Sequence, residues 1–553
     1  MSDDSRIQII PLGGMGEIGK NMMAIRYNDS IVVIDSGLMF PEEELLGIDV
    51  VIPDITYLVE NKEKVKAILL THGHEDHVGA LPYVLKELNV PVYGSKLTLG
   101  IVEGKLKEYN LGHVDLRTVR PRDIIRIDDF KVEFIRVSHS IPDALAIAIH
   151  SPIGIVLHTG DIKLDQTPVD GQVVDFRKLA ELGEKGVLVM MSDSTNADRP
   201  GFTMSEKVVG NTFDELFGKC EGRIIVTTFA SNVHRIQQVV TTAEKYGRKV
   251  AIVGRSMINN VRISTELGYM HIAEDILIEM EDISKYPPNE IVIVTTGSQG
   301  EPMSALTRMA TADHRWIGIE SGDTVIISAT PIPGNEKLVA KTVDLLFRQG
   351  AEVIYERGMG VHVSGHAAQE ELKILINLIR PRYFIPVHGE YRHLMKHAKI
   401  AESLGLPRSR IFVAENGQVI EVGKKKALVS GKVTAGKILV DGLGVGDVGN
   451  IVLRDRKQLS QDGIMIVVVT MDKDLGQVVA GPDIVTRGFV YVRESEELIE
   501  DAKGKVKEAL DICEKRNITE WAVIKSQVRD KLGKHLYDKT GRRPMILPII
   551  MEV

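Results

Sequence analysis

The segment LLTHGHEDHVGAL, residues 69–81, places three histidines and two acidic residues within six consecutive positions. The apolar run VKAILLT predicts a buried strand that ends at Thr71. Because residues two apart project to the same side of an extended chain, His72 and His74 can bind one ion. Asp76 and His77 follow directly and suit a second ion. Imidazole and carboxylate groups are common ligands of zinc and manganese, so this spacing predicts a metal centre.

Further candidate ligands stand where other predicted strands end. His139 follows DFKVEFIRVS, Asp161 follows GIVLHTG, and His388 follows RYFIPV. With the first four residues they would complete two metal shells, in which Asp161 is suited to bridge the ions. His158 lies inside the strand before Asp161, which favours a place in the core or behind a ligand. Two other histidines lack such a context and are expected to be structural: His113 and His150.

Two ions held about 3.5–4 Å apart are typical of enzymes that transfer phosphoryl groups. Such a pair lowers the pKa of a bound water toward neutrality and stabilises the charge that develops on the attacked phosphate. The same centre could open a carboxylic ester, a thioester or a lactam. The candidate ligands therefore predict hydrolysis without identifying the substrate.

The composition is that of a globular protein with several domains. The chain has 553 residues, which predicts two to four domains, and is 44% apolar and 26% charged. The start MSDDSRIQII lacks the pattern of a signal peptide, and no apolar run is long enough to cross a membrane. Cys220 and Cys513 cannot build a disulfide framework, so a cytoplasmic location is expected. The net charge of −8 does not exclude a local basic groove for nucleic acid.

The predicted secondary structure changes from short strands to alternating strands and helices along the chain. Residues 6–37 form short alternating runs, which predict antiparallel strands. GMGEIG at 14–19 also matches a dinucleotide-binding pattern, with Asp35 as a ribose ligand, but no helix pattern follows, so a strand connection is preferred. From about residue 205, strands and helices alternate as in a parallel α/β domain. The run RYFIPVHG again resembles the strands of the N-terminal part. The lysine- and glycine-rich segment 426–447 is expected to be a linker before a small α/β unit.

Several motifs together resemble those of the metallo-β-lactamase superfamily. HGHEDH with His139, Asp161 and His388 carries the metal-ligand pattern, and the inserted α/β block resembles a β-CASP domain. The likeness is close to the bacterial ribonuclease J family and extends over nearly the whole chain. It is carried by GGMGEIGKN, SDSTN (192–196), FASNVHRIQ (229–237), GSQGEPMSAL (297–306), HVSGHA (362–367), PVHGEYRHL (386–394) and RRPMILPIIMEV.

The resemblance implies an α/β fold with three parts. An αββα metallo-β-lactamase core would contain an inserted parallel α/β β-CASP domain, and a small C-terminal α/β domain would follow. The expected boundaries are 1–205 and 361–425 for the core, 206–360 for the β-CASP domain, 426–447 for the linker and 448–553 for the C-terminal domain. The C-terminal domain resembles the dimerisation domain of the family.

The resemblance also implies roles for individual residues. Asp76 would serve catalysis, Asp193 would orient the ligands, and His366 would protonate the leaving oxygen or stabilise its charge. Asp441 marks a possible structural Ca²⁺. Two Zn²⁺ ions, for which Mn²⁺ or Mg²⁺ can substitute, would be held by His72, His74, Asp76, His77, His139, Asp161 and His388. A pocket for the 5′-terminal phosphate of RNA would be formed by Ser231, Asn232, His362, Val363, Ser364, Gly365 and His366.

The implied function is that of a ribonuclease in mRNA decay and rRNA maturation. It would remove nucleotides from the 5′ end of single-stranded RNA, favouring a 5′-monophosphate, and would also cut internally. A homodimer, a homotetramer or a hetero-oligomer with a paralogue is expected, without membrane association. Two alternatives are a small-molecule hydrolase of glyoxalase or lactamase type and a non-catalytic RNA-binding subunit. The inserted domain and HVSGHA disfavour the first, and the intact ligand set disfavours the second.

Overall fold

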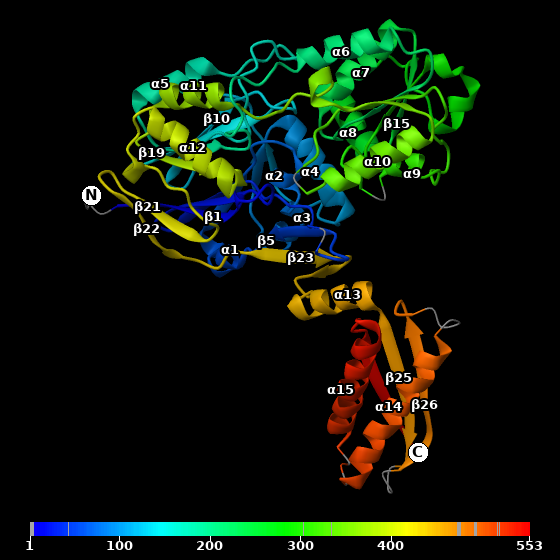
Figure 1. Cartoon of the computed structure of the whole chain (residues 1–553). Helices are drawn as coiled ribbons and strands as arrows, with labels where there is room; N and C mark the ends of the chain where they lie inside the picture. Colours follow the sequence, from blue (N-terminus) through cyan, green and yellow to red (C-terminus); the bar gives the residue numbers. More distant parts are fainter. Residues whose placement is uncertain are drawn as a thin grey trace. The chain divides into compact units, whose positions relative to one another are not determined.

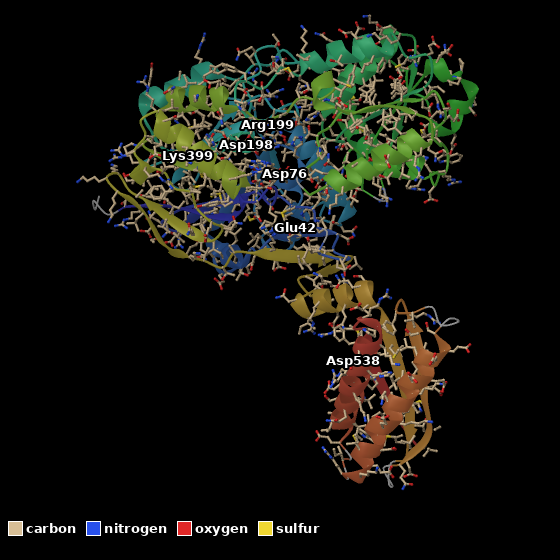
Figure 2. All side chains as sticks on the ribbon, viewed as in Figure 1. Glu42, Asp76, Asp198, Arg199, Lys399 and Asp538 are labelled. Atoms are coloured by element: carbon tan, nitrogen blue, oxygen red, sulfur yellow. The ribbon has the colours of Figure 1, made fainter. Side chains whose placement is uncertain are left out.

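The chain folds into two compact units, Met1–Phe40 with Val50–Ile438, and Pro41–Asp49 with Leu439–Val553. Figure 1 traces the elements, and Figure 2 adds the side chains, with Asp76 labelled in the first unit and Asp538 in the second. Residues 302 and 303 of the GSQGEPMSAL motif lie outside the described part. The computed structural model describes residues 5–42, 44–301, 304–332, 334–472, 477–490, 495–516, 518 and 520–553.

Two β-sheets enclose the main core of the first unit, which contains Ile9 from one sheet and Phe134 from the other. Strands β1, β3 and β4 pair antiparallel, as expected for residues 6–37. The eight-stranded sheet has the order β22 (Ala427–Lys432), β21 (Gln418–Val422), β1 (Ile7–Gly13), β3 (Met22–Tyr27), β4 (Ser30–Ile34), β6 (Val65–Leu69), β7 (Val92–Gly94), β8 (Leu116–Thr118). The six-stranded sheet has the order β19 (Tyr383–Val387), β13 (Val187–Asp193), β12 (Gly154–His158), β11 (Leu145–Ser151), β10 (Phe130–Arg136), β9 (Ile124–Ile127).

Helices cover the outer faces of both sheets and complete the αββα core. The six-stranded sheet packs against α5 (Phe176–Lys185), α11 (Gln369–Ile379) and α12 (Tyr391–Ser403) through a second apolar cluster. The eight-stranded sheet contacts α4 (Lys96–Glu108), which in turn packs on α3 (Leu81–Glu87). The segment GMGEIG leads into strand β3 rather than a helix, so the dinucleotide-binding alternative lacks the helix N-terminus that it requires.

The inserted β-CASP domain has a five-stranded sheet in which every pairing is parallel, as the alternation of strands and helices predicts. Its strands are short Val- and Ile-rich runs because helices bury both faces of the sheet. The order is β15 (Lys249–Val253), β16 (Ile291–Thr295), β14 (Ile224–Thr227), β17 (Thr324–Ile327), β18 (Glu352–Ile354). One face carries α6 (Lys207–Phe217), α7 (Val233–Lys245) and α8 (Arg255–Glu266), and the other carries α9 (Ala305–Ala310) and α10 (Glu336–Arg348).

The segment 426–447, which is expected to be a linker, contains regular strands. It contains β22, which pairs with β21 at the edge of the eight-stranded sheet, and then β23 (Lys437–Asp441) and β24 (Gly444–Val445), which form a hairpin. Lysine is common on exposed edge strands because its charge prevents pairing with a further chain. Lys432 lies on this edge strand, and Lys426 directly precedes it.

The C-terminal part of the second unit is a small α/β unit, as predicted. Its three-stranded sheet has the order β26 (Val478–Arg487), β25 (Ile464–Met471), β27 (Met545–Glu552). The helices α14 (Glu496–Lys515) and α15 (Trp521–Thr540) pack on one face of this sheet, and α13 (Asn450–Asp462) precedes it. Among the described residues, no helix has the length and hydropathy that a membrane crossing requires.

Candidate metal centre

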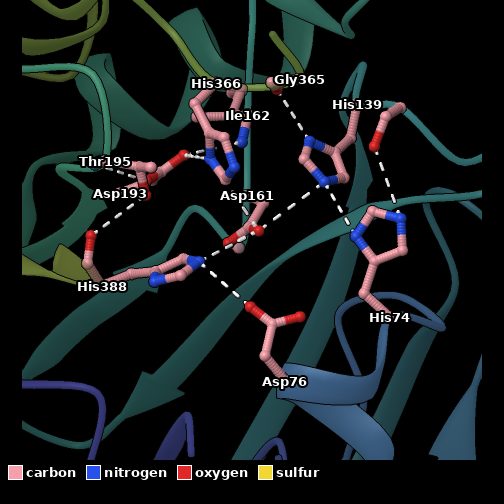
Figure 3. Close-up of polar contacts among 12 residues, drawn as sticks. His74, Asp76, His139, Asp161, Ile162, Asp193, Thr195, Gly365, His366 and His388 are labelled. Carbon is pink, nitrogen blue, oxygen red and sulfur yellow. Dashed lines mark hydrogen bonds and ion pairs between the residues drawn. The ribbon is translucent and has the colours of Figure 1, made fainter. Parts of the chain in front are cut away.

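The side chains of His72, His74, His139 and Asp161 converge on a first half-site at the ends of strands in the first unit. Figure 3 shows His74, His139 and Asp161 of this group. His74 Nδ1 lies 3.0 Å from His72 Nε2 and 3.1 Å from His139 Nε2. Asp161 Oδ2 lies 3.7 Å from His72 Nε2 and 3.6 Å from His139 Nε2. Three ring nitrogens and one carboxylate oxygen therefore face a common point, which is the arrangement of a four-coordinate metal site.

A second half-site shares Asp161 with the first. His77 Nε2 lies 3.2 Å from Asp161 Oδ1 and 3.5 Å from Asp76 Oδ2. His388 Nε2 lies 3.2 Å from Asp161 Oδ2 and 3.5 Å from Asp76 Oδ2. Because both oxygens of Asp161 face ligand nitrogens, this carboxylate is placed to bridge two ions. All seven predicted ligands belong to these two half-sites.

Strand ends and one strained residue, His388, hold these side chains in place. The short helix α2 (Glu75–Val78) begins directly after His74 and turns Asp76 and His77 toward the second half-site. His388 follows β19 with a φ of 53°, a left-handed conformation that costs a histidine about 1–3 kcal/mol. Its backbone N–H donates to Gly14 O, and its carbonyl accepts from Ser194 N–H. This strain persists because the two neighbouring segments fix the peptide on both sides.

Hydrogen bonds behind four ligands hold the outer ring nitrogens, so that the inward ring nitrogens face the half-sites. His77 Nδ1 donates to Asp35 Oδ2 at 2.7 Å, and His139 Nδ1 donates to Gly365 O at 2.7 Å. His72 Nδ1 lies 3.0 Å from Thr71 Oγ1, and His74 Nε2 lies 3.4 Å from Ser140 Oγ. An imidazole whose outer nitrogen carries the proton presents a lone pair at the other nitrogen, as metal-bound histidines do.

His388 supplies a second indication that the residues fit a metal. Both of its ring nitrogens are buried and have no hydrogen-bond partner among the described residues. Nε2 is close to two carboxylates without the angle of a hydrogen bond. A buried polar atom without a partner costs about 1–3 kcal/mol, and a cation at the half-site would remove that cost for Nε2.

The two half-sites differ in electrostatics. Burial lowers the pKa of His72 and His139 well below the ordinary histidine value, and that of His74 to about 4. Burial also acts on His388, but the Asp161 carboxylate outweighs it and raises the pKa of His388 to about 9. The first half-site therefore holds neutral imidazoles, whereas the second attracts protons that a metal must displace.

Asp35 is the main functional residue that the sequence analysis did not place correctly. It ends strand β4 with a φ of 61° and accepts hydrogen bonds from Thr71 N and Oγ1, both at 2.8 Å, besides His77. It therefore orients the ligand His77 and fixes Thr71, the residue before the ligand His72, instead of binding a ribose. The rule that identified His139 and Asp161, a polar residue at the end of a predicted strand, also applies to Asp35.

The predicted catalytic pair Asp193 and His366 lies beside the second half-site (Figure 3). His366 Nδ1 donates to Asp193 Oδ2 at 2.7 Å, and the other oxygen of Asp193 accepts from Thr195 N and Oγ1. Burial lowers the pKa of His366, but the Asp193 carboxylate outweighs it, so that the pKa is raised. The pair thus places an imidazole whose protonated form is favoured next to Asp161 and His388.

The predicted phosphate residues lie on two segments around this pair. Ser231 and Asn232 stand at the N-terminus of α7, where the Asn232 side chain accepts from Arg235 N–H. In the segment His362–His366, Ser364 Oγ accepts from Asn196 Nδ2 at 2.8 Å, which leaves its own proton available. The Val363 carbonyl accepts from Arg235. Gly365 brings its carbonyl to His139, and an added Cβ would come within 2.6 Å of the His139 ring.

The residues around Asp441 do not fit the expected Ca²⁺. The Asp441 carboxylate forms a close ion pair with Arg456, whose Nη1 donates to Leu46 O at 2.9 Å. The other nearby acid, Asp49, accepts from Gly442 N–H at 2.7 Å. Ca²⁺ requires six to eight oxygen ligands. A guanidinium already pairs with the Asp441 carboxylate, so few oxygens are left here for a cation.

Two facing sheets with imidazoles and carboxylates at their strand ends, and a parallel α/β domain inserted before the last ligand, define a β-CASP metallo-hydrolase. Four family descriptions match consecutive parts of the chain. They are "Metallo-beta-lactamase superfamily" (residues 15–182), "Ribonuclease J, beta-CASP domain" (221–346), "Zn-dependent metallo-hydrolase RNA specificity domain" (351–413) and "Ribonuclease J C-terminal domain" (451–553).

Similar proteins narrow the class to one family. Ribonuclease J2 of Bacillus subtilis (strain 168) is 50% identical over 550 residues, which cover 99% of each chain. Ribonuclease J 2 of Staphylococcus aureus (strain MRSA252) is 46% identical over 548 residues, covering 99% of this chain and 98% of the relative. A solved structure, a protein of unknown function from Enterococcus faecalis V583, shares the fold with a TM-score of 0.55 at 18% identity, over 75% of this chain and 100% of the other.

The chain belongs to the ribonuclease J family and is a metal-dependent ribonuclease. The fold class, the family resemblance and the nuclease activity expected from the sequence are thereby confirmed. The small-molecule hydrolase and the non-catalytic subunit lose their support.

Proposed function

We propose that the chain is a 5′-to-3′ exoribonuclease that favours 5′-monophosphate RNA and also cuts RNA internally. The observation that carries this proposal is the contact between the HVSGHA segment and the metal centre: the Gly365 carbonyl accepts from the ligand His139 at 2.7 Å. A segment that can bind a phosphate and also orients a ligand sets a fixed distance between the RNA end and the cut site.

The seven predicted residues hold two Zn²⁺ ions in this proposal, and Mn²⁺ or Mg²⁺ can substitute. When bound, the ions supply Lewis acidity and lower the pKa of water toward neutrality. Asp161 would contribute to both half-sites, and His72, His74 and His139 would complete one of them. The other half-site would be completed by Asp76, His77 and His388.

The catalytic roles of Asp193 and His366 follow from their pairing. Asp193 accepts the Nδ1 proton of His366 and so orients the ring. The proton on Nε2 of His366 can then be given to the leaving oxygen, or can stabilise its charge. Asp193 is 2% exposed and also accepts three hydrogen bonds from Thr195 and Ile162, so its carboxylate keeps a fixed direction.

The 5′-phosphate pocket is the part of the proposal that explains directionality. The Ser364 hydroxyl can donate to a phosphate, and Ser231 and Asn232 stand at the N-terminus of α7, whose helix dipole favours an anion. His362 is held by Arg235, and Val363 and Gly365 turn their carbonyls away from the phosphate toward Arg235 and His139. Single-stranded RNA fits best, because one strand passes a buried centre more easily than a duplex.

The experiment that tests this function uses one RNA sequence with three different 5′ ends. We expect the 5′-monophosphate RNA to be degraded to mononucleotides fastest, and the 5′-triphosphate and 5′-hydroxyl RNAs to be cut mainly inside. Metal content is measured on the same preparations. Equal rates and equal products from all three RNAs would contradict the pocket assignment, and changes at Ser364 or His366 should affect the 5′-monophosphate RNA most.

We further propose that the C-terminal domain forms a dimer through an open sheet face. The helices cover the face with Met465 and Val467, whereas the alternate residues face away. On that open face Ile466 stands between Val485 and Leu547, and Val468 stands next to Ile549. Val485, Leu547, Ile549 and Met551 are 45%, 47%, 40% and 49% exposed, a row that a second copy of the chain would cover.

The remaining parts of the proposal concern location and organisation. The enzyme acts in the cytoplasm in mRNA decay and rRNA maturation, as a homodimer, a homotetramer or a hetero-oligomer with a paralogue. The proposed core spans 1–205 and 361–425, the β-CASP domain 206–360 and the C-terminal domain 448–553. Light scattering of the purified chain tests the oligomer, and RNA levels in cells depleted of the protein test the pathway.

A further inference from the structure

Arg235 is the largest of the fully buried side chains, with 0% exposure, and lies on α7 of the β-CASP domain. Its Nε and Nη2 donate to the two oxygens of Glu206, each at 2.8 Å. Nη1 donates to Ser328 O at 2.8 Å and to His362 Nδ1 at 2.7 Å, and Nη2 donates to Val363 O at 3.3 Å. A guanidinium has five N–H donors, and here all of them have an acceptor.

The partners of Arg235 come from separate parts of the first unit. Glu206 directly precedes α6, and its backbone N–H donates to Asp165 Oδ2 at 2.9 Å. Asp165 pairs with Lys163 at 3.3 Å, and Lys163 follows the bridging ligand Asp161 by two residues. Arg235 is therefore tied on one side to the segment that carries Asp161.

On its other side, Arg235 holds the segment 361–366 where the chain returns from the β-CASP domain to the core. Ser328, which accepts from Arg235 with its carbonyl, donates its hydroxyl to Val361 O at 2.6 Å. Four residues after Val361, the Gly365 carbonyl accepts from His139 Nδ1, and the next residue, His366, pairs with Asp193. A shift of this segment is thus passed directly to one metal ligand and to the proposed acid.

We propose that Arg235, oriented by Glu206, is a positioning residue that sets the segment 361–366 against the metal centre and so governs the rate of RNA cleavage. It does not touch the reacting atoms. The inference rests on the proposed roles of His139 and His366, but it does not depend on the direction of degradation. Lysine cannot replace arginine here, because an ammonium lacks the planar fork that reaches Glu206, Ser328 and Val363 together.

The same domain offers a matched control in Arg223. Arg223 is also buried and donates in the same forked way to Asp323, at 2.8 and 2.6 Å, and to Gly318 O at 3.0 Å. Arg223 and Asp323 directly precede β14 and β17, whereas Ser328 directly follows β17. The two ion pairs therefore have similar chemistry but lie at opposite ends of the strands of one parallel sheet.

The test compares Arg235→Lys with Arg223→Lys in the full-length, metal-loaded protein. We expect both variants to lower the melting temperature and to keep the wild-type metal content. Only Arg235→Lys should lower kcat, by about 10- to 100-fold, the usual effect of losing a group that orients a ligand. Hydrogen–deuterium exchange should rise in the peptide covering 361–366 in Arg235→Lys and not in Arg223→Lys. The inference is overturned if either difference between the two variants is absent.

Two further measurements distinguish a failure of this inference from a failure of the proposed function. Each variant is assayed on linear 5′-monophosphate RNA and on circular RNA, and the loss of kcat should appear on both, since His139 and His366 serve either mode of cutting. A wild-type enzyme that ignores the 5′ end would contradict the proposed directionality but not this inference. Glu206→Gln keeps the shape of the partner, and its effect combined with Arg235→Lys should be less than additive. Full additivity would show that Glu206 does not act through Arg235.

Discussion

The two units of the chain depart from ordinary burial in opposite ways. In the first unit, side chains that normally face water are buried, and His72 and Asp161 are only 0% and 3% exposed. In the second unit, apolar side chains that are normally buried, among them Leu547 and Ile549, lie on an open sheet face. Burying polar groups and exposing an apolar face are both unfavourable unless a bound ligand or partner compensates for the cost. The clustered buried polar groups of the first unit form the metal centre, whereas the exposed apolar row of the second unit is the surface that we propose for assembly.

The largest expected effect comes from a substitution among the buried polar groups. Asp76→Ala removes one oxygen from the second half-site, and we expect it to abolish RNA cleavage. The Asp76 side chain is 30% exposed, so the fold should be retained. Cleavage is followed on gels and the fold by circular dichroism. Nuclease activity at the wild-type level in a metal-free preparation of this variant would contradict the metal mechanism.

The next prediction concerns a residue that supports a ligand without being one. Asp35→Asn leaves the size of the side chain unchanged but weakens the acceptor for His77 Nδ1, so metal affinity should fall about 10- to 100-fold. Competition with a chelator measures the affinity. Asp29→Asn is the matched control, because Asp29 pairs with Lys64 at the surface and should be neutral. Equal metal affinities of the two variants would show that Asp35 does not support the metal centre.

A smaller effect is expected from Gly365→Ala. The new Cβ would lie 2.6 Å from His139 Cε1, so the segment or the ring has to move. We expect kcat to fall about tenfold, because a misplacement of under 1 Å already impairs a reacting geometry. Gly112→Ala has no atom near its Cβ and serves as the control. A Gly365→Ala enzyme as fast as Gly112→Ala would show that the segment can be displaced without consequence.

The open sheet face should affect assembly and leave chemistry nearly untouched. Ile549→Asp places a charge in the middle of the apolar row, so the molar mass in light scattering should fall to that of a monomer. RNA cleavage per chain should stay within about twofold of wild type, as is usual for surface substitutions. Ile451→Asp, at a residue 67% exposed on α13, is the control that should not change the mass. An unchanged mass in both variants would disprove the proposed interface.

The smallest effect tests whether every buried histidine is functional. His397 is buried, packs on Phe384 and has its pKa lowered to about 3 by burial. In the unfolded chain it takes a proton below about pH 6.5, so folding loses stability as pH falls from there toward 3. In chelator-treated protein, His397→Asn should reduce this loss by up to about 1.4 kcal/mol per pH unit. Chemical unfolding at pH 8 and pH 5.5 measures this loss of stability. An equal loss in wild type and His397→Asn would show that His397 is not the buried group that takes up the proton.

The sequence was sufficient to predict the strand-end residues of the centre. Each of His139, Asp161 and His388 follows an apolar run, and strand ends can be recognised from local pattern alone. The same holds for the parallel sheet of the inserted domain, whose short Val- and Ile-rich runs alternate with helices. These predictions succeed because the information lies within a few neighbouring residues.

Other parts of the structure depend on contacts between distant residues. The bond between His139 and Gly365 joins positions 226 residues apart, and the Arg235–Glu206 pair joins two helical regions that carry no shared pattern. Asp35 carried a usable signal, but its position after GMGEIG suggested a ribose contact instead. The edge strand β22 was taken for a linker because lysine and glycine are common in both.

His388 reaches Asp76 and His77 only after the chain has passed through the entire inserted domain. A protein leaves the ribosome from its N-terminus, and its domains generally fold as units during synthesis. On the proposed assignment, a nascent chain can assemble the half-site of His72, His74 and His139 while the other half still lacks its last ligand. The nuclease thus stays incomplete while most of its own messenger is being translated.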